Sequence, residues 1–292
     1  APGILAPVRG TPCYVLPGVP FEMRVMFDAE VAPRLRSATG GTVVLSRRLH
    51  AFGMGESDLG ERIRDLMQRG RNPEVGTTAE FGQIGIRINA TAPALPTATT
   101  LLDETEAEIR RRLGVVVFGR DDDTLARVVG ELLVNARQTL GTAESCTGGL
   151  IGTLITDVPG SSRYYAGGVI AYANDVKADL LGVDRTNLER HGAVSEPVAR
   201  ALAEGARRAC HTDFALSTTG IAGPDGGTAA KPVGLVYIGL AGPAGIEVHE
   251  HRFGHDAPRE AIRLRAARTA LNLLRLKLVA PAAAHGRVAS GR

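Results

Sequence analysis

The spacing of apolar and polar residues changes along the chain and divides it into regions. Residues 84–91 alternate, with Ile84, Ile86 and Ile88 on one face, as a half-buried strand does. Residues 56–68 carry their apolar residues at helical spacing. The same reasoning predicts further elements at residues 43–52, 101–113 and 115–118. Together these elements predict a small α+β domain over residues 41–120, which shows no obvious chemistry of its own.

Residues 1–40 hold too few elements for a core. A short apolar run ends in the turn-forming sequence Pro17-Gly18-Val19-Pro20, and a helical pattern follows at residues 21–35. One strand and one helix cannot bury a core of their own. We therefore expect either that a partner covers this segment or that preceding residues of a longer protein are absent from this sequence, which opens at Ala1 without a methionine.

Strand and helix patterns alternate in the third region, residues 121–280. An amphipathic helix is predicted at residues 125–140. The other elements expected here are helices at residues 150–155 and 259–278 and strands at residues 168–171 and 215–219. Residues 281–292 are small and polar and are predicted to form a disordered tail.

Composition narrows the class of protein. The chain has 292 residues, a net charge of +3, 44% apolar and 4% aromatic residues, which argues against disorder and against a strongly basic nucleic-acid binder. No apolar run approaches the roughly 18 residues that span a bilayer. The cysteines Cys13, Cys146 and Cys210 form no paired motif. These features predict a soluble, cytoplasmic protein in a reducing compartment.

Lysine is scarce in this chain. Of the 34 basic residues only Lys177, Lys231 and Lys277 are lysines, and the others are arginines. An amine can lose its proton when it is desolvated and then act as a base, which guanidinium effectively cannot do. Each lysine is therefore a candidate for chemistry that arginine cannot perform, although a surface position is the alternative for each.

The first polar cluster is Thr142-Ala143-Glu144-Ser145-Cys146-Thr147-Gly148-Gly149. A short strand that turns into a helix N-terminus here exposes backbone N–H groups and a positive dipole, which suit a phosphate or a carboxylate. The alternative interpretation is a serine cap followed by close-packed glycines. The sequence leaves both open.

Two further clusters carry hydroxyl and amine groups. Pro159-Gly160-Ser161-Ser162 is a turn that either presents a nucleophile or caps the next element. Tyr172 and Lys177 flank a predicted strand-to-helix turn, so both could face one pocket. A desolvated lysine beside a serine hydroxyl can activate that hydroxyl without a histidine. A helix-surface lysine is the structural alternative.

The fourth cluster is a glycine-rich loop, residues 217–227, followed by Lys231-Pro232-Val233-Gly234. Such a loop lets backbone N–H groups approach a ligand closely. It lacks the Gly-Lys-Ser/Thr ending of a phosphate-binding P-loop.

Metal sites are disfavoured. The acidic residues 121–123 stand where a helix N-terminus would begin, and negative charge there suits the helix dipole. His249 and His251 alternate on a predicted strand with one solvent-facing side, which makes zinc binding with His255 the less favoured interpretation.

Taken together, these clusters resemble the competence/damage-inducible protein CinA family, whose C-terminal domain is the nicotinamide mononucleotide deamidase PncC. The matching segments lie at residues 143–149, 159–162, 172–177, 181–183, 191–198, 220–227 and 231–234. The resemblance implies a three-layer α/β/α deamidase domain at residues 121–280, preceded by a KH-type α+β domain at residues 41–120. Residues 1–40 resemble the end of a molybdopterin-binding-type α/β domain.

The reaction implied by this resemblance is hydrolysis of the carboxamide of nicotinamide mononucleotide to the acid and ammonia, in pyridine nucleotide recycling. In family terms Ser162 is the nucleophile, Lys177 its base, and Tyr172 assists proton transfer. Ser145 and Thr219 match active-site hydroxyls, and the N–H groups of residues 219–221 are oxyanion-hole candidates. Ser145 stays the alternative nucleophile, and Cys146 is a weaker one.

The resemblance also implies substrate-binding residues, which are Glu144, Thr147, Gly148, Gly149, Gly220, Ile221, Ala222, Gly223 and Arg259. Arg259 matches an arginine suited to the substrate phosphate, although Ala257-Pro258 replaces the family's preceding aspartate. No metal or cofactor is expected for deamidation. A divalent metal is expected only with a complete N-terminal pyrophosphatase domain, whose Gly-Gly-Leu-Gly-Pro signature does not occur here.

The implied partners are the mononucleotide substrate and a second copy in a homodimer, without nucleic acid or membrane. Two other functions remain open: a nucleotide-binding protein without turnover, and an ADP-ribose pyrophosphatase that acts through a complete first domain.

Overall fold

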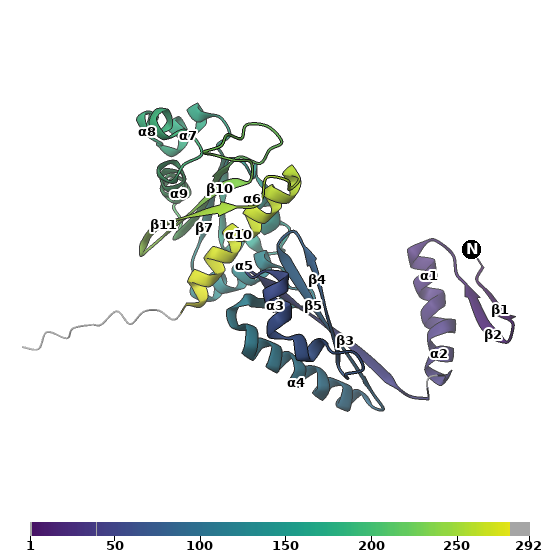
Figure 1. Cartoon of the computed structure of the whole chain (residues 1–292). Coiled ribbons are helices and arrows are strands. Elements are labelled where there is room, and N and C mark those ends of the chain that lie inside the picture. Colours follow the sequence, from purple (N-terminus) through teal and green to yellow (C-terminus); the bar gives the residue numbers. More distant parts are fainter. Residues whose placement is uncertain (1, 39, 281–292) are drawn as a thin grey trace, which may run out of the picture. The chain divides into compact units, whose positions relative to one another are not determined.

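The computed structural model describes residues 2–38 and 40–280 (Figure 1). The tail predicted at residues 281–292 lies outside the described residues. Contacts within the chain define two compact units. The first comprises the described residues up to Arg48 with Arg62–Gly76 and Arg87–Arg112, and the second comprises Leu49–Glu61, Thr77–Ile86 and the described residues from Leu113 onward.

The N-terminal elements are an antiparallel hairpin and a broken helix. Strands β1 (Ile4–Val8) and β2 (Thr11–Val15) form the hairpin. Helices α1 (Pro20–Met26) and α2 (Ala32–Ala38) flank a π-helical turn, Phe27–Val31. No residue of α1 is buried, so these elements leave most of their apolar side chains exposed.

A four-stranded sheet with the order β4-β5-β3-β6 follows. Its elements are β3 (Val43–Phe52), α3 (Glu56–Arg62), a 3-10 segment (Arg64–Met67), β4 (Glu74–Glu80), β5 (Gln83–Ala92), α4 (Leu95–Leu113), a second 3-10 segment (Gly114–Val116) and β6 (Val117–Arg120). The single helix expected at residues 56–68 is thus two shorter segments. Strand β4 was missed because Val75 is its only buried residue, which leaves no alternation to read.

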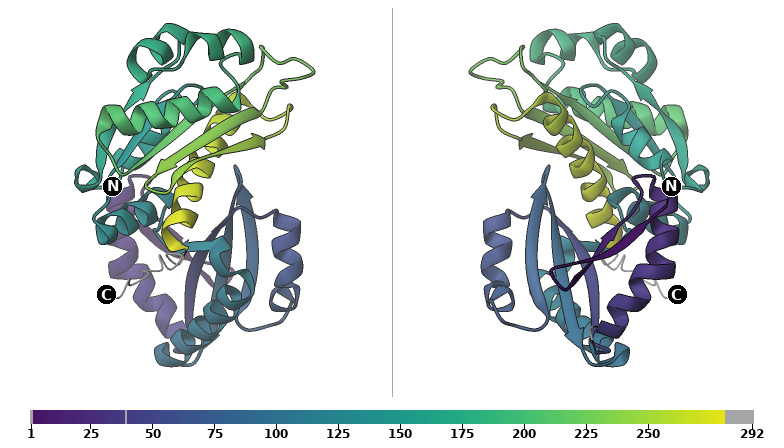
Figure 2. Two further views of the ribbon diagram at one scale, coloured as in Figure 1. Left: turned by 90° about the vertical axis from the view of Figure 1, so that its left-hand side faces the viewer. Right: turned by 90° about the vertical axis from the view of Figure 1, so that its right-hand side faces the viewer.

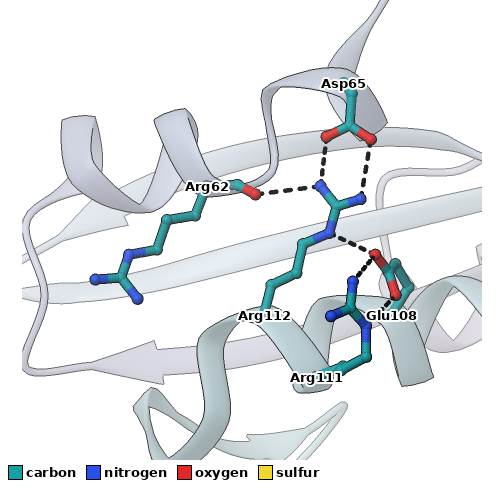
Figure 3. A network of polar contacts seen from close by, with 5 residues as sticks. All are labelled: Arg62, Asp65, Glu108, Arg111 and Arg112. Carbon is teal, nitrogen blue, oxygen red and sulfur yellow. Dashed lines mark hydrogen bonds and ion pairs between the residues drawn. The ribbon is translucent and has the colours of Figure 1, made fainter.

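Helix α4 begins at Leu95, earlier than residue 101, because Pro96 fits a first helical turn. Its C-terminal half carries a surface network of ion pairs (Figure 3). Arg112 pairs with Asp65 and donates to Glu108 Oε1 at 2.6 Å, and Arg111 donates to both oxygens of Glu108 at 2.7 Å.

The C-terminal region is built on a five-stranded sheet with the order β11-β10-β9-β7-β8. Its strands are β7 (Leu140–Glu144), β8 (Tyr165–Ile170), β9 (Phe214–Gly220), β10 (Leu235–Gly242) and β11 (Gly245–Arg252). Strand β7 runs parallel to its neighbours β8 and β9, whereas β10 is antiparallel to β9 and β11. Strand β8 therefore stands at one edge of the sheet.

Helices cover both faces of this sheet, which confirms the three-layer α/β/α prediction. They are α5 (Leu125–Ala136), α6 (Leu150–Thr156), α7 (Asn174–Leu181), α8 (Arg185–His191), α9 (Glu196–Cys210) and α10 (Arg259–Val279). Figure 2 shows α9 and α10 on opposite faces. Helices α5, α6 and α10 share one apolar core cluster, and α7, α8 and α9 share the other.

One prediction about the start of this region was wrong in its limits. Helix α5 ends at Ala136 and not at residue 140, because Arg137 adopts a left-handed conformation with φ of 55° and Leu140 already begins β7. The residue that caps α5 is Thr124, whose hydroxyl accepts from the Arg127 N–H at 3.1 Å. The acidic residues 121–123 lie before this cap.

Candidate functional site

Three of the four polar clusters of the sequence converge where β7, β8 and β9 end. These strands are parallel, so the segments that follow them emerge at one edge of the sheet, here called the carboxyl edge. The chain leaves β7 for β8 on one side and later returns to β9 on the other. Such a switch point, outside the carboxyl ends of the strands, is where open α/β sheets bind ligands.

Glu144 ends β7 and is 2% exposed. Its Oε2 accepts the N–H groups of Gly149 and Ile151, both at 3.0 Å, and its Oε1 accepts the N–H of Gly152 at 2.9 Å. The negative charge that suits the N-terminus of α6 is thus the protein's own carboxylate. Glu144 therefore holds the loop after β7 in place, and its carboxylate already accepts the N–H groups that were expected to attract an anion.

The three residues after Glu144 pack against the end of β9. The Ser145 N–H donates to the Thr218 carbonyl at 3.0 Å, and the hydroxyls of Thr147 and Thr218 are hydrogen-bonded at 2.7 Å. Burial raises the pKa of Cys146 to about 12, which keeps its thiol protonated at neutral pH and disfavours it as a nucleophile.

Lys177 lies in the first turns of α7 and is 1% exposed. Its Nζ donates to the Tyr172 carbonyl at 2.8 Å. Burial lowers its pKa below the ordinary value, an effect that nearby Cys146 opposes. A buried amine that donates to a neutral carbonyl is poised to lose its proton, which is the property that a general base requires.

Tyr172 and Arg259 meet across the carboxyl edge. Tyr172 is 63% exposed, and its hydroxyl accepts from Arg259 Nη2 at 3.3 Å. Arg259 Nη1 donates to the Gly223 carbonyl at 2.6 Å. The first residue of α10 therefore joins the end of β8 to the glycine-rich loop, although Ala257 and Pro258 replace the aspartate of the family pattern.

The segment at the end of β9 supplies fewer free donors than expected. Thr219 is 1% exposed and donates its hydroxyl to the Ala193 carbonyl at 2.7 Å. The Ile221 N–H donates to the Leu235 carbonyl at 2.9 Å, and Gly220 lies opposite Val236 in the sheet. The N–H of Ile221 is thus engaged in strand pairing and is not a free oxyanion donor.

Gly148, Gly149 and Gly223 have φ values of 59°, 94° and 73°, conformations that side chains rarely adopt. Ala222 is buried beside this loop. These residues shape the two loops that border the carboxyl edge.

Ser162 lies at the opposite ends of the parallel strands, before the start of β8. It belongs to an exposed 3-10 turn, Ser161–Arg163, that precedes β8, whereas Lys177 follows the end of β8. The six residues of β8 span roughly 20 Å at the usual rise of a strand. Within one chain the structure therefore brings Lys177, Tyr172, Ser145 and Arg259 to one edge and leaves Ser162 at the other.

Two residues at the carboxyl edge were not among the predicted site residues. Arg263 donates to the Thr147 carbonyl at 2.7 Å and so fixes the loop after β7. It stands one turn after Arg259 on α10, a spacing that places both on one helix face. Thr218, which bonds both Ser145 and Thr147, lacked a signal because a threonine within a strand is ordinary.

The described residues contain no group of three or more histidine, cysteine, aspartate or glutamate side chains that could hold a metal ion. The expectation that His249 and His251 face solvent was wrong. Both are half-buried, and burial lowers the pKa of His251, whose ring stacks on Phe253. Among the described helices, none is long and apolar enough to cross a membrane.

Two family descriptions match this chain. The CinA C-terminal domain matches residues 122–278, and the damage-inducible protein CinA KH domain matches residues 46–119. A CinA-like protein of Parasynechococcus marenigrum is 48% identical over 282 residues, which cover 96% of this chain and 67% of that protein. A CinA-like protein of Gloeobacter violaceus is 46% identical over 281 residues, which cover 96% of this chain and 66% of that protein. This chain thus spans about two thirds of these relatives.

A solved structure resembles part of this chain. The competence/damage inducible protein CihA of Agrobacterium tumefaciens matches with a TM-score of 0.51 and 43% identity, over 53% of this chain and 93% of that one.

Proposed function

This chain belongs to the CinA family, and from that premise we propose that it hydrolyses the carboxamide of nicotinamide mononucleotide to nicotinate mononucleotide and ammonia. The observation that carries the proposal is Lys177, a lysine 1% exposed whose pKa burial lowers, at the carboxyl edge of a parallel sheet. Hydrolysis of an amide needs a base that can take a proton near neutral pH. An arginine-rich chain that keeps a buried lysine at this position fits that need.

The proposed reaction has two halves. The neutral Lys177 Nζ takes the proton of a serine hydroxyl, whose oxygen attacks the carboxamide carbon. When the tetrahedral oxyanion collapses, Lys177 gives the proton to the nitrogen of the carboxamide. This nitrogen departs as ammonia, and the acyl group remains bound to the serine as an ester. Water then attacks this ester, gives a proton to Lys177 and releases the acid, after which the proton returns to the serine oxygen.

Two serines can supply the hydroxyl. Ser145 follows β7 at the same edge as Lys177, and Ser162 precedes β8 at the opposite edge. Tyr172, whose carbonyl accepts from Lys177 and whose hydroxyl accepts from Arg259, assists proton transfer in this proposal.

Arg259 is proposed to bind the phosphate of the mononucleotide. Its guanidinium reaches the glycine-rich loop and the exposed Tyr172 hydroxyl at the carboxyl edge. A planar guanidinium matches phosphate geometry with two parallel hydrogen bonds. Thr147, Gly148, Gly149, Gly220, Ile221, Ala222 and Gly223 form the walls of the proposed pocket, and Thr219 supports it through Ala193.

The proposed chemistry uses no metal, because an amine supplies the base and a serine hydroxyl supplies the nucleophile. We also propose that the enzyme works in the cytoplasm as a homodimer. The test is ammonia release from nicotinamide mononucleotide by the purified protein in the presence of EDTA. Turnover in EDTA supports the proposal, whereas binding of the mononucleotide without ammonia would favour a nucleotide-binding protein.

A pyrophosphatase is the other candidate activity in the family resemblance. Its chemistry would belong to a complete N-terminal domain, of which this chain resembles only the end. Assaying ADP-ribose hydrolysis with a divalent metal beside the deamidase assay separates the two activities.

A further inference from the structure

The outer edge of β8 is open. Strand β8 is the last strand in the order of the five-stranded sheet, and among the described residues it pairs only with β7. Ala166, Gly168 and Ile170 are exposed, and nothing lies within 4 Å of the position that a Cβ of Gly167 would take. The strand contains no charge and no proline, the devices that usually keep an edge from pairing.

The two ends of β8 carry groups that would complement each other in chemistry. The turn before it presents Ser162, an exposed hydroxyl. The segment after it holds Tyr172 and the buried amine of Lys177. One chain cannot bring these ends together, because the strand itself separates them by roughly 20 Å.

We propose that two copies of this chain pair antiparallel through β8 and that each active site takes Lys177 from one copy and Ser162 from the other. A two-fold axis near the central Gly167 and Gly168 places the start of one β8 beside the end of its partner. Within the strand a residue then lies opposite the one equally far beyond the axis, so Tyr165 of one copy faces Ile170 of its partner. The turn that holds Ser162 in one copy is thereby placed beside the segment that leads from β8 into α7 in the other. Paired strands lie only about 4.8 Å apart.

Exposed apolar side chains mark the same edge. Ile170 is 58% exposed, Tyr172 is 63% exposed and Leu180 of α7 is 61% exposed. In an antiparallel pair the end of each β8 lies beside the start of the other, so each copy would cover these side chains of its partner. Another partner could form hydrogen bonds with the free backbone groups of β8, but it would not place a serine hydroxyl near Lys177.

This inference rests on the proposed deamidation, and a complementation experiment tests it. Ser162→Ala and Lys177→Met homodimers are each expected to be inactive. After co-expression and purification of the mixed dimer pool, one of the two sites in every heterodimer has both groups intact. Ammonia release should return to about a quarter of the wild-type rate, since about half of the dimers are mixed and each has one intact site.

A matched control mixes two single variants whose substitutions both lie at the carboxyl edge. In a mixture of Lys177→Met and Tyr172→Ala every site carries one lesion, so no recovery is expected. The same result for the Ser162→Ala and Lys177→Met mixture, with heterodimers confirmed by mass spectrometry, would overturn the shared site. Full activity of Ser162→Ala would also overturn it and would assign the nucleophile to Ser145.

A second measurement does not depend on turnover. A Ser162→Cys/Asn174→Cys double variant is expected to form a covalent dimer on mild oxidation, because the turn that holds Ser162 in one copy is placed beside the start of α7 in the other. Within one chain they are too far apart for a disulfide. The single variants control for Cys13, Cys146 and Cys210.

The two proposals fail in different ways. A covalent dimer from a protein that releases no ammonia would refute the deamidase function and keep the β8 pairing. Ammonia release by a protein that neither recovers activity on mixing nor forms the covalent dimer would refute the pairing and keep the function.

Discussion

Charged side chains occupy two contrasting settings in this molecule. On α4, Glu108 accepts from Arg111 and Arg112, and these hydrogen bonds lower its pKa to about 2 (Figure 3). At the carboxyl edge of the five-stranded sheet, Lys177 is buried with one carbonyl partner, and burial lowers its pKa. The surface pairs favour the charged forms, whereas burial disfavours the charged amine.

The contrast distinguishes charged groups that keep a protein surface hydrated from a buried group that can take part in a reaction. Exposed ion pairs add little stability because water already solvates both partners. A buried amine costs stability, and its retention points to chemistry. Substitutions at the carboxyl edge should therefore change turnover strongly, whereas substitutions in the α4 network should change both turnover and stability little.

The largest effect is expected for Lys177→Arg. A guanidinium keeps its charge, so the base is lost, and kcat for ammonia release should fall by about 10³-fold. Lys277→Arg is the matched control, since Lys277 forms an exposed ion pair with Glu247. Near-normal kcat in Lys177→Arg, with Lys277→Arg also normal, would remove Lys177 as the base.

Glu144→Ala should destabilise the fold. It removes the acceptor of three backbone N–H groups at the start of α6 and leaves buried donors unpaired, at a cost of about 2–4 kcal/mol in the free energy of unfolding. Urea denaturation measures this change. Glu144→Gln keeps one acceptor oxygen and should lose less, so equal losses for the two variants would contradict the capping role.

Arg259→Ala should act on substrate binding. Loss of a guanidinium contact to the substrate phosphate should raise KM for the mononucleotide by about 10- to 100-fold and change kcat less. Arg252→Ala, which removes an exposed ion pair with Glu250 on β11, is the control. A fall in kcat at constant KM would instead place Arg259 in the chemical step.

The pH dependence of stability should also differ between the two settings. The folded state lowers the pKa of Lys177, so between that value and the unfolded pKa of about 10.4 the unfolded chain binds more protons. Stability from this group therefore rises with pH through that window, by about 1.4 kcal/mol for each pKa unit of difference. Denaturation of Lys177→Met across the same pH range should lack this rise, and an unchanged profile would show that the amine is not desolvated.

The smallest effect is expected for Glu108→Gln. The Glu108 side chain is 30% exposed and that of its partner Arg111 is 70% exposed, so water still reaches the pair. The melting temperature should therefore change by less than about 2 °C, and less still in high salt. Turnover should be unchanged. A large loss of stability would mean that the network on α4 is more than a solvated surface.

Much of the C-terminal fold follows from its sequence because strands and helices there have clear periods. Ile84, Ile86 and Ile88 likewise reveal β5, whereas β4 buries too little to show a pattern. The end of α5 at Ala136 depended on the conformation of Arg137, which sequence periodicity does not record.

The site was predictable in its residue types and less so in its arrangement. The scarcity of lysine drew attention to Lys177, and its burial agrees with that inference. The separation of Ser162 from Lys177 is a consequence of strand direction, which pairwise spacing in the sequence cannot express. The engagement of Glu144 with α6 and of Ile221 with Leu235 likewise depends on backbone partners that only the fold defines.

The most direct test of the account is a titration of the lysine side chains by NMR in protein labelled with ¹³C at lysine Cε. The chain has only Lys177, Lys231 and Lys277, so the spectrum is simple, and Lys177→Arg assigns one signal by its absence. The account predicts that this signal titrates well below the other two. Titration of all three near the ordinary lysine pKa of about 10.4 would contradict it.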